Sequence, residues 1–247
     1  MKKILLFDVD GTIAESGQKI SPYTLTIIQK LKDKYDIGIV GGGKLDKILE
    51  QLSSRDNIFH HYFTECGCVY HKNDGTNLVP VYIKNLRNHK LYPKINILVK
   101  TCLSFLSTVD YLVTGYFIDL RNGIIYVSLI GMTATNEERA YFMDLDKKNN
   151  YREKLVKLLK HDCKKLGIAD TVTVCEGGRV GIAIYPNEYD KIQVLDIVLA
   201  DYSEIHYFGD KYKEDGNDYH IITDRRVIGH PVDSVEDTEK ILLTLLN

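Results

Sequence analysis

The sequence predicts an α/β protein, in which a parallel sheet covered by helices carries a smaller, inserted α+β unit. Near both ends of the chain, short apolar runs typical of buried strands alternate with helical patterns. This β-α-β-α rhythm is characteristic of parallel sheets. In the middle of the chain the rhythm changes to paired strands and longer helices. We therefore expect a core domain made of residues 1–81 and 187–247, and an inserted domain made of residues 82–186.

The core begins with a strand that ends in two acids. Residues 4–7 form an apolar run, and Asp8-Val9-Asp10-Gly11-Thr12 follows it directly. Alternation along a strand would place Asp8 and Asp10 on one face, and Gly11 permits a tight turn after them. Two carboxylates at the end of a strand can bind a hard cation through oxygen. They can also serve as a nucleophile and as a general acid and base.

The next elements keep the same rhythm. Ser21 and Pro22 are typical of the start of a helix, and an apolar stripe at helical spacing continues to about residue 35. A strand at residues 37–40 then ends in a glycine-rich segment, residues 41–44. Parallel sheets bind ligands at the carboxyl ends of their strands. We therefore expect the acidic segment and the glycine-rich segment at one edge of the sheet.

The last part of the chain adds further charged residues at strand and helix ends. Residues 205–208 predict a strand that stops at Asp210, and Lys191 begins a helical segment. Carboxylate oxygens are the ligands that Mg²⁺ prefers, with substrate phosphate completing its shell, and a lysine nearby offsets the charge of a phosphoryl group. The expected cluster consists of Asp8, Asp10, Asp210 and either Asp218 or Asp215.

The inserted unit carries antiparallel signals. Asn122-Gly123 lies between apolar runs at residues 116–120 and 124–128, a strong hairpin signal. Residues 135–138 (TNEE) form a capping box that opens a helix. Strands are expected at residues 171–175 and 179–185. Pro80 and Pro93 bracket a less regular stretch at the start of the unit.

Composition excludes several classes of function. The formal net charge is -2, which gives no electrostatic case for binding nucleic acid or an anionic membrane. The five cysteines are an odd, scattered set, which favours reduced thiols in a reducing compartment. No window approaches the ~20 apolar residues of a membrane span. We therefore expect a cytoplasmic protein whose partners are small molecules, neither nucleic acid nor membrane.

The chain resembles the eukaryotic phosphomannomutases of the haloacid dehalogenase (HAD) superfamily over nearly its full length. The shared stretches include DVDGT (8–12), IGIVGG (37–42), FIDLRNG (117–123), NEERAYFMDLDKK (136–148), YPNEYDK (185–191), FGDK (208–211) and DGND (215–218). The resemblance implies a HAD-type, Rossmann-like core with an inserted cap domain, and a homodimer through the cap. It also implies a Mg²⁺-dependent interconversion of mannose 6-phosphate and mannose 1-phosphate that feeds GDP-mannose synthesis. A hexose 1,6-bisphosphate is the implied activator.

Roles follow from the resemblance by position. Asp8 is the implied nucleophile, which forms an aspartyl phosphate, and Asp10 the general acid and base. From its position near the same edge, we expect Lys191 to be a further catalytic residue. The implied Mg²⁺ ligands are the Asp8 carboxylate, the Asp10 carbonyl and Asp210. Part of a second ion site matches at the Ile222 carbonyl and Asp224, with Val227 at the position of its threonine ligand. In the cap, the implied clamp for the distal phosphate of the substrate is Arg121 and Arg139.

The chain departs from the family pattern at several substrate contacts. Gly43 stands where a serine that hydrogen-bonds the transferring phosphoryl group is usual. Arginines are replaced at Gly17 and Met132, and a serine and an aspartate of the cap are replaced at Gly181 and Ala183. The resemblance therefore implies that the nucleophile, the acid/base residue and the first metal site are kept, while the substrate contacts are fewer.

Alternation along residues 179–185 suggests one replacement. Arg179, Gly181, Ala183 and Tyr185 would share a strand face. The hypothesis is that the Arg179 guanidinium occupies the space left at Gly181 and Ala183. The alternative is an exposed arginine at an edge.

Three functions remain open at this point. The first is a phosphomannomutase-like phosphoryl transfer. The second is a Mg²⁺-dependent HAD sugar-phosphate phosphatase, in which water accepts the phosphoryl group because tight distal phosphate binding is weakened. The third is a weakly active family member kept for binding or regulation.

Overall fold

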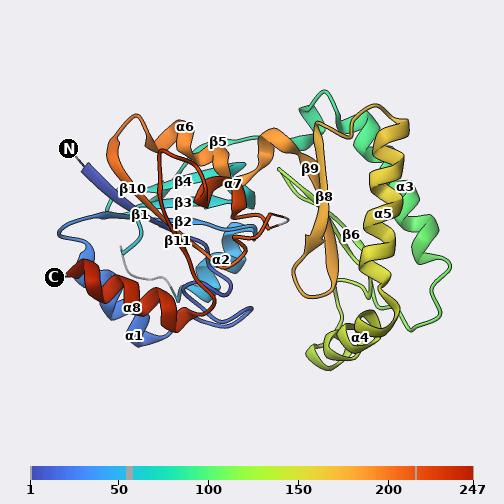
Figure 1. Cartoon of the computed structure of the whole chain (residues 1–247), viewed down its shortest axis with the longest axis horizontal. Coiled ribbons are helices and arrows are strands. Elements are labelled where there is room, and N and C mark those ends of the chain that lie inside the picture. The colour runs from blue at the N-terminus through green and yellow to red at the C-terminus, as the bar shows by residue number, and fades with distance from the viewer. Residues whose placement is uncertain (1, 54–57, 215, 247) are drawn as a thin grey trace. The chain divides into compact units, whose positions relative to one another are not determined.

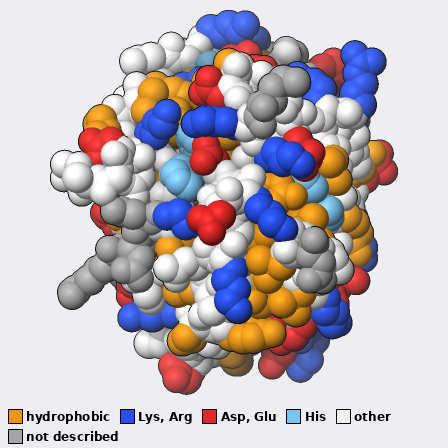
Figure 2. Space-filling model, turned by 90° about the vertical axis from the view of Figure 1, so that its left-hand side faces the viewer, with side chains coloured by type: hydrophobic (Ala, Val, Ile, Leu, Met, Phe, Trp, Pro, Cys, Tyr) orange, Lys and Arg blue, Asp and Glu red, His pale blue; other side chains and the backbone are white. Residues whose placement is uncertain are grey.

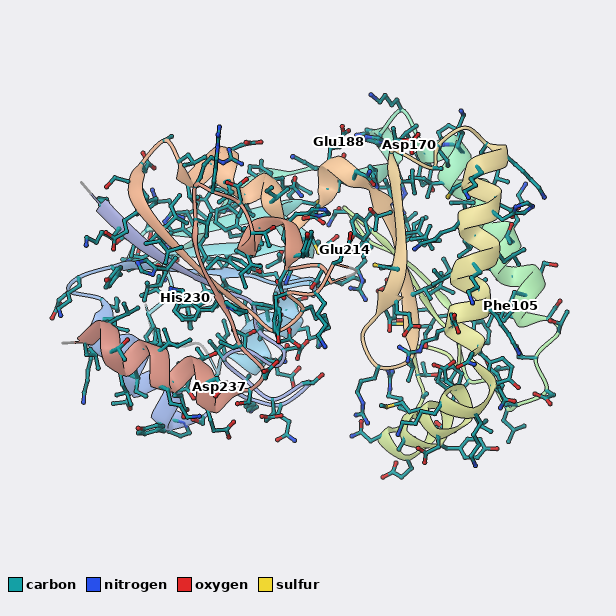
Figure 3. The ribbon with its side chains drawn as sticks, viewed as in Figure 1. Phe105, Asp170, Glu188, Glu214, His230 and Asp237 are labelled. Atoms are coloured by element: carbon teal, nitrogen blue, oxygen red, sulfur yellow. The ribbon has the colours of Figure 1, made fainter. Side chains whose placement is uncertain are left out.

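The computed structural model describes residues 2–53, 58–214 and 216–246, and the chain divides into two compact units (Figure 1). The core unit contains residues 1–84 and 189–247, and the cap unit contains residues 85–188, ending at Glu188 (labelled in Figure 3). These boundaries lie two or three residues beyond the expected 81/82 and 186/187. The reason at the first crossing is strand β5 (Leu78–Ile83), which pairs with the core sheet up to Ile83.

In the described part of the core, seven strands form one sheet in the order β11-β10-β1-β2-β3-β4-β5. The five strands from β11 to β3 run parallel, and β4 and β5 are antiparallel additions. The central strands are apolar on both faces, as strands of a sheet covered by helices must be. Besides β5, the strands are β1 (Lys2–Phe7), β2 (Asp36–Val40), β3 (His61–Thr64), β4 (Val69–Asn73), β10 (Tyr202–Gly209) and β11 (Ile228–Pro231).

Helices cover both faces of this sheet, as Figure 1 shows, with α1 and α8 together on one face and α6 and α7 on the other. The expected cap of α1 is present, since the Ser21 hydroxyl accepts from the Thr24 N–H at 3.0 Å. Two of the apolar clusters in the core unit lie on opposite sides of β1, because alternate residues of this strand belong to different clusters. The helices are α1 (Pro22–Leu31), α2 (Leu45–Gln51), α6 (Leu195–Val198), α7 (Tyr219–Ile222) and α8 (Val235–Leu246), with short 3₁₀ turns η1 (Glu65–Gly67), η3 (Asn187–Tyr189) and η4 (Lys191–Val194).

The stretch between Pro80 and Pro93 is irregular at residues 84–91, as expected, but its first residues belong to a strand. Pro80 lies inside β5, opposite His71 of β4, at a shift in the register of the pair. A proline cannot donate to the ladder, and it is tolerated because β5 is the edge strand of the sheet.

The cap unit is a four-stranded sheet with helices packed on it. The strand order is β6-β7-β9-β8 and all neighbours are antiparallel. Figure 1 shows α3 and α5 beside one face of this sheet. The predicted Asn-Gly hairpin joins β6 to β7, and the predicted capping box is complete, with Thr135 and Glu138 each accepting from the other's backbone N–H. The elements are η2 (Leu86–Asn88), α3 (Tyr92–Leu106), β6 (Ile118–Leu120), β7 (Ile125–Ser128), α4 (Asn136–Asn149), α5 (Tyr151–Lys165), β8 (Val172–Gly177) and β9 (Gly181–Pro186).

Neither unit contains, among the described residues, a helix long and apolar enough to cross a membrane. Lysine, arginine and acidic side chains are interspersed on the face of the molecule drawn in Figure 2. This mixture agrees with the small net charge of the sequence.

A buried histidine ties three strands of the core sheet together. His61 on β3 is 3% exposed, and its two ring nitrogens lie 2.8 Å from the hydroxyls of Tyr70 and Tyr202. The Tyr202 hydroxyl donates to Asp36, so it accepts from His61 Nε2–H, and Nδ1 accepts from Tyr70. Both nitrogens are thus satisfied in the neutral ring. Burial, with a contribution from Lys72, lowers the pKa of His61 to about 4.

This pKa predicts a loss of stability in acid. The pKa of an unperturbed histidine is about 6.5, so the unfolded chain binds a proton at His61 before the folded chain does. The free energy of unfolding therefore keeps its full value above pH 6.5 and falls as the pH drops toward 4, by about 3 kcal/mol from this group at 1.36 kcal/mol per pH unit. Urea unfolding of the wild type and of a His61→Phe variant, measured by circular dichroism between pH 8 and pH 4, tests this.

The variant should be less stable at pH 8, and the difference from the wild type should shrink as the pH falls. A His161→Asn variant, which changes an exposed histidine of α5, should keep the pH dependence of the wild type. Parallel pH profiles for wild type and His61→Phe would show that His61 is not the titrating group.

Candidate active site

The site is built where β1 ends. Asp8 follows the last residue of the strand and is 5% exposed, and its backbone N–H donates to the Phe208 carbonyl of neighbouring β10 at 2.9 Å. Asp10 lies in the turn that follows, and its carboxylate has different partners from that of Asp8. The predicted common strand face does not extend to this pair, because β1 stops at Phe7.

Lys191 is the centre of the site. Its side chain is fully buried, and Nζ donates to Asp8 Oδ1 and to Asp218 Oδ1, both at 2.7 Å. Asp218 accepts two further hydrogen bonds, from the Tyr207 hydroxyl and from the Lys211 backbone N–H. The Asp218 carboxylate is thus fixed by Tyr207 and Lys211 while it accepts from Lys191. The structure joins the expected residues Asp8, Lys191 and Asp218, while Asp215 lies outside the described residues.

Burial and charge act in opposite directions in this cluster. Burial lowers the pKa of Lys191, but Asp218 and Asp8 outweigh it and raise the pKa well above the usual value for lysine. Burial raises the pKa of Asp8 to about 7; Lys191 opposes this shift, and Asp218 adds to it. Burial likewise raises the pKa of Asp210. The Lys211 ammonium lies 3.9 Å from Asp210 Oδ2, so three carboxylates face two ammonium groups, and the remaining negative charge favours a bound cation.

The carboxylates can hold that cation. One oxygen from each of Asp8, Asp210 and Asp218 lies within 4.8 Å of the others. Asp210 Oδ1 is buried and has no hydrogen-bond partner among the described residues. Gly11 leaves room for Asp210, since a Cβ at this position would lie 2.7 Å from Asp210 Oδ2. This donor set consists of oxygens alone, as a hard divalent cation requires.

Asp10 is held by the neighbouring loop and helix. Its Oδ1 accepts from the Gly17 N–H and from the Gln51 amide, both at 2.8 Å, and Lys47 Nζ is 3.5 Å from Oδ2. Burial raises the pKa of Asp10, but Lys47, Gly17 and Gln51 outweigh it and lower the pKa. Gly17, where the resemblance implied an arginine to be replaced, lines a cavity of about 470 Å³ beside these residues.

A strained turn supports the glycine-rich segment at the end of β2. Glu65, Cys66 and Gly67 all have left-handed backbones, with φ of 50°, 57° and 88°, which is uncommon for residues other than glycine. The N–H groups of Glu65 and Cys66 donate to the carbonyls of Gly43 and Gly41. Strained backbone of this kind is concentrated at functional sites. Gly43 itself brings no side chain to the site, as the sequence implied.

The expected second ion site is not assembled. Both carboxylate oxygens of Asp224 accept from the Arg226 guanidinium, at 2.8 and 2.9 Å, and Val227 packs against a core cluster. The carbonyl of Ile222 is close to Gly229, where a Cβ would lie 2.1 Å from that oxygen. The chain's own arginine thus neutralises Asp224, and Ile222, Asp224 and Val227 do not fit a cation.

In the cap, Arg121 and Arg139 are ordered by neighbouring oxygens. Arg121 Nε donates to Asp119 Oδ2 at 2.8 Å. Arg139 donates from Nε to the Ala134 carbonyl and from Nη2 to the Met132 carbonyl, both at 2.9 Å. Met132 therefore contributes a backbone oxygen, and its side chain does not replace the arginine.

The hypothesis for Arg179 was wrong in its geometry. Arg179 lies in the turn between β8 and β9, outside the strand alternation, and its Nε contacts Met143 Sδ at 3.4 Å. The space beside Gly181 is filled by another side chain, because a Cβ there would lie 2.5 Å from the Tyr126 ring. Ala183 lies directly opposite Tyr126 in the β7–β9 pair.

Several partners of the expected site residues, three in the core and one in the cap, could not be recognised in the sequence. Tyr207, Lys47, Gln51 and Tyr126 all occur within ordinary apolar or helical patterns. The one signal was the position of Tyr207 in β10, the strand that ends at Gly209 directly before Asp210.

A buried lysine between two aspartates at the end of a parallel strand, beside carboxylates that can hold a cation, is the arrangement expected of a phosphoryl-transfer enzyme with a HAD-type core. Solved structures share this fold. The IMP-nucleotidase of Plasmodium falciparum superposes with a TM-score of 0.69 at 17% identity, covering 99% of this chain and 68% of that one. A trehalose-6-phosphate phosphatase related protein superposes with a TM-score of 0.53 at 16% identity, covering 99% of this chain and 97% of that one.

Comparisons with related sequences narrow the class. The family model for eukaryotic phosphomannomutase matches residues 24–247. The phosphomannomutase of Arabidopsis thaliana is 38% identical over 237 residues, which cover 95% of this chain and 93% of that protein. Phosphomannomutase 1 of Homo sapiens is 37% identical over 240 residues, which cover 95% of this chain and 88% of that protein. The chain belongs to the eukaryotic phosphomannomutase family.

The buried ion pair predicts a large effect of removing the lysine charge. Lys191→Met keeps the shape of the side chain but leaves Asp8 and Asp218 buried together without a cation. The free energy of unfolding should fall by about 3 to 5 kcal/mol, measured by urea unfolding without added metal. The double variant Lys191→Met/Asp218→Asn should recover part of this loss, because it removes one of the unpaired charges.

Lys47→Met is the matched control, since Lys47 is 55% exposed and its pair with Asp10 is long, at 3.5 Å. Lys47→Met should lower the free energy of unfolding by less than about 1 kcal/mol. Equal free energies of unfolding for the Lys191 and Lys47 variants would contradict the claim that Lys191 compensates the buried charges of Asp8 and Asp218.

Proposed function

We propose that this chain interconverts mannose 6-phosphate and mannose 1-phosphate, and that Asp8 exchanges the phosphoryl group with the sugar. The single observation that carries the proposal is the geometry of Asp8, a buried carboxylate 2.7 Å from the Lys191 ammonium and grouped with Asp210, whose Oδ1 has no hydrogen-bond partner among the described residues. Family membership supports the sugar substrate, since the related proteins are phosphomannomutases.

The chemistry is two phosphoryl transfers in opposite directions. An Asp8 oxygen attacks the phosphorus of a hexose 1,6-bisphosphate, the bond from phosphorus to the sugar oxygen breaks, and Asp10 gives that oxygen a proton. In the return step a hydroxyl of the incoming hexose monophosphate loses its proton to Asp10 and attacks the aspartyl phosphate. Asp8 is thereby freed and a bisphosphate is formed again. Lys191 offsets charge beside the reacting oxygen throughout.

We further propose that the cation is Mg²⁺ and that the Asp8 and Asp210 carboxylates, with the Asp10 carbonyl, would hold it. When bound, it would neutralise part of the charge on the phosphoryl oxygens. Asp218 has its oxygens engaged by Lys191, Tyr207 and the Lys211 N–H, so we assign it to the lysine. The proposed activator is a hexose 1,6-bisphosphate.

The proposed partners are hexose phosphates and a second copy of the chain, bound through the cap. The proposed compartment is the cytoplasm, where the product would feed GDP-mannose synthesis. All five cysteines are free thiols, which is usual in a reducing compartment.

One assay separates mutase from phosphatase. The protein is incubated with mannose 1-phosphate, Mg²⁺ and a trace of glucose 1,6-bisphosphate, and hexose 6-phosphate and free phosphate are both measured. We expect hexose 6-phosphate as the main product, and Asp8→Asn should reduce its formation by more than about a thousandfold because the nucleophile is lost. Free phosphate as the main product would replace the mutase with a HAD phosphatase, and the absence of both products would favour a binding role.

The matched control is Asp46→Asn, which changes an acid in the first turn of α2 for which the structure shows no role in the site. It should leave the rate within about twofold of the wild type. An Asp8→Asn variant that keeps its activity would remove Asp8 as the nucleophile.

The cation site makes a separate prediction. Mg²⁺ should raise the melting temperature of the wild type, because an ion that binds only the folded chain stabilises it. Asp210→Asn should abolish this increase and also the activity. Differential scanning fluorimetry across a Mg²⁺ titration measures the first effect without any assay of turnover.

Asp224→Asn provides the comparison, since the Asp224 carboxylate is already paired with Arg226. This variant should show the same Mg²⁺-dependent increase as the wild type. If Asp224→Asn loses the increase and Asp210→Asn keeps it, the cation binds at the other acidic position.

A further inference from the structure

One face of the cap sheet carries a row of facing side chains. Asp119 of β6 lies opposite Tyr126 of β7, which lies opposite Ala183 of β9. The residues on either side of Tyr126, Ile125 and Val127, are buried at 1% and 0% exposure and so lie on the face that α3 and α5 cover. Since strand neighbours alternate, the row lies on the opposite face, which these two helices leave uncovered.

The Tyr126 ring occupies the room around small residues. A Cβ at Gly177 would lie 3.3 Å from the ring, one at Gly178 would lie 3.1 Å from the hydroxyl, and one at Gly181 would lie 2.5 Å from both the ring and the hydroxyl. The hydroxyl donates to the Gly177 carbonyl at 3.0 Å. A Cβ at Gly181 would also lie 2.4 Å from the Val127 carbonyl oxygen, so a larger residue there would require both the Tyr126 ring and the β7 backbone to move.

Tyr126 also fixes an arginine. The Arg121 guanidinium carbon lies 5.1 Å from the centre of the Tyr126 ring, within the range of a cation–π contact. Its Nε donates to Asp119, so the guanidinium is held by a carboxylate on one side and by a ring face on the other. Arg121 is 14% exposed. Arg139 contributes a second positive charge near the Tyr126 hydroxyl: burial raises the pKa of Tyr126, and Arg121, Arg139 and Arg152 oppose this shift.

We propose that Tyr126 is a positioning residue for substrate binding: it fills the space left by Gly181 and Ala183 and holds Arg121 where this arginine, together with Arg139, binds the phosphate that is not transferred. The inference rests on the proposed function for the identity of the substrate. It explains how a chain without the serine and aspartate at positions 181 and 183 keeps an ordered phosphate site, because aromatic packing replaces their polar contacts.

The chemistry fits a sugar phosphate. A planar guanidinium binds phosphate through two parallel N–H···O bonds, and their strength depends on its orientation. The ring of Tyr126 and the carboxylate at Nε fix the plane of the Arg121 guanidinium, and this plane sets the direction from which a phosphate can bind it. Since this phosphate is remote from the bond that breaks, the contact contributes equally to the bound substrate and to the transition state, and its loss raises KM more than it lowers kcat.

The test compares two substitutions of one side chain. Tyr126→Leu removes the ring, and we expect KM for mannose 1-phosphate to rise about tenfold while kcat stays within about twofold. Tyr126→Phe keeps the ring over Arg121 and should change KM by less than about threefold. Tyr23→Leu, at an exposed tyrosine of α1, is the control and should leave both constants unchanged.

The proposal is overturned if Tyr126→Leu leaves KM unchanged, or if it lowers kcat without raising KM. If Tyr126→Leu does not fold, Asp119→Asn takes its place, since it releases the same guanidinium from its carboxylate. That variant should raise KM in the same way, and an unchanged KM there is equally decisive against the proposal.

A second measurement does not depend on turnover. Mannose 1-phosphate should protect Arg121 of the wild type from modification by phenylglyoxal, followed by mass spectrometry of its peptide, and Tyr126→Leu should lose most of this protection. If the wild type makes no hexose 6-phosphate but Arg121 is protected, the proposed function fails and the positioning role stands. If Arg121 of the wild type is not protected, the positioning role is wrong.

Discussion

The buried pair of contacts from Lys191 to Asp8 and Asp218 is the interaction on which the rest of the site depends. A fully buried ammonium is costly unless its charge is matched and its protons are bonded, and here two carboxylates at 2.7 Å supply both. Asp218 is fixed in turn by Tyr207 and by the Lys211 N–H. The arrangement orients Asp8 and places it in a group of three carboxylates, Asp8, Asp210 and Asp218, that can hold a metal ion.

Close approach of backbone and side chain makes this cluster possible. Gly11 and Gly209 stand beside Asp210 and Asp218, where a Cβ would lie 2.7 Å or less from the carboxyl groups. The left-handed turn at residues 65–67 is held from the other side by Gln193, whose amide donates to the Cys66 carbonyl at 2.8 Å. Gln193 lies two residues after Lys191, so the same short 3₁₀ segment positions the lysine and supports the turn. Strain and crowding are thus concentrated around the reacting group.

In the proposed function, the two units have separate tasks. The core would supply Asp8 as the nucleophile, Asp10 as the acid/base residue and the carboxylates for a cation, all near the ends of its parallel strands. The cap supplies guanidinium groups ordered by carbonyl and carboxylate oxygens and by one aromatic ring. Where the chain has the small residues Gly181 and Ala183, the ring of Tyr126 lies beside them. Beside Val227, which stands in place of a threonine ligand, Arg226 donates to both carboxylate oxygens of Asp224.

The sequence by itself determined the alternation of strands and helices, the inserted hairpin and capped helix, and the residues Asp8, Lys191 and Asp210, because periodicity and end signals are local properties of the chain. It did not determine β4, β5 and β11, whose short strands depend on pairing with the sheet. Nor did it indicate that Arg226 neutralises Asp224, that Arg179 lies in a turn, or that Tyr126 fills the space at Gly181. Only the tertiary structure decided these features, because each depends on a contact between side chains or turns that the local sequence pattern does not specify.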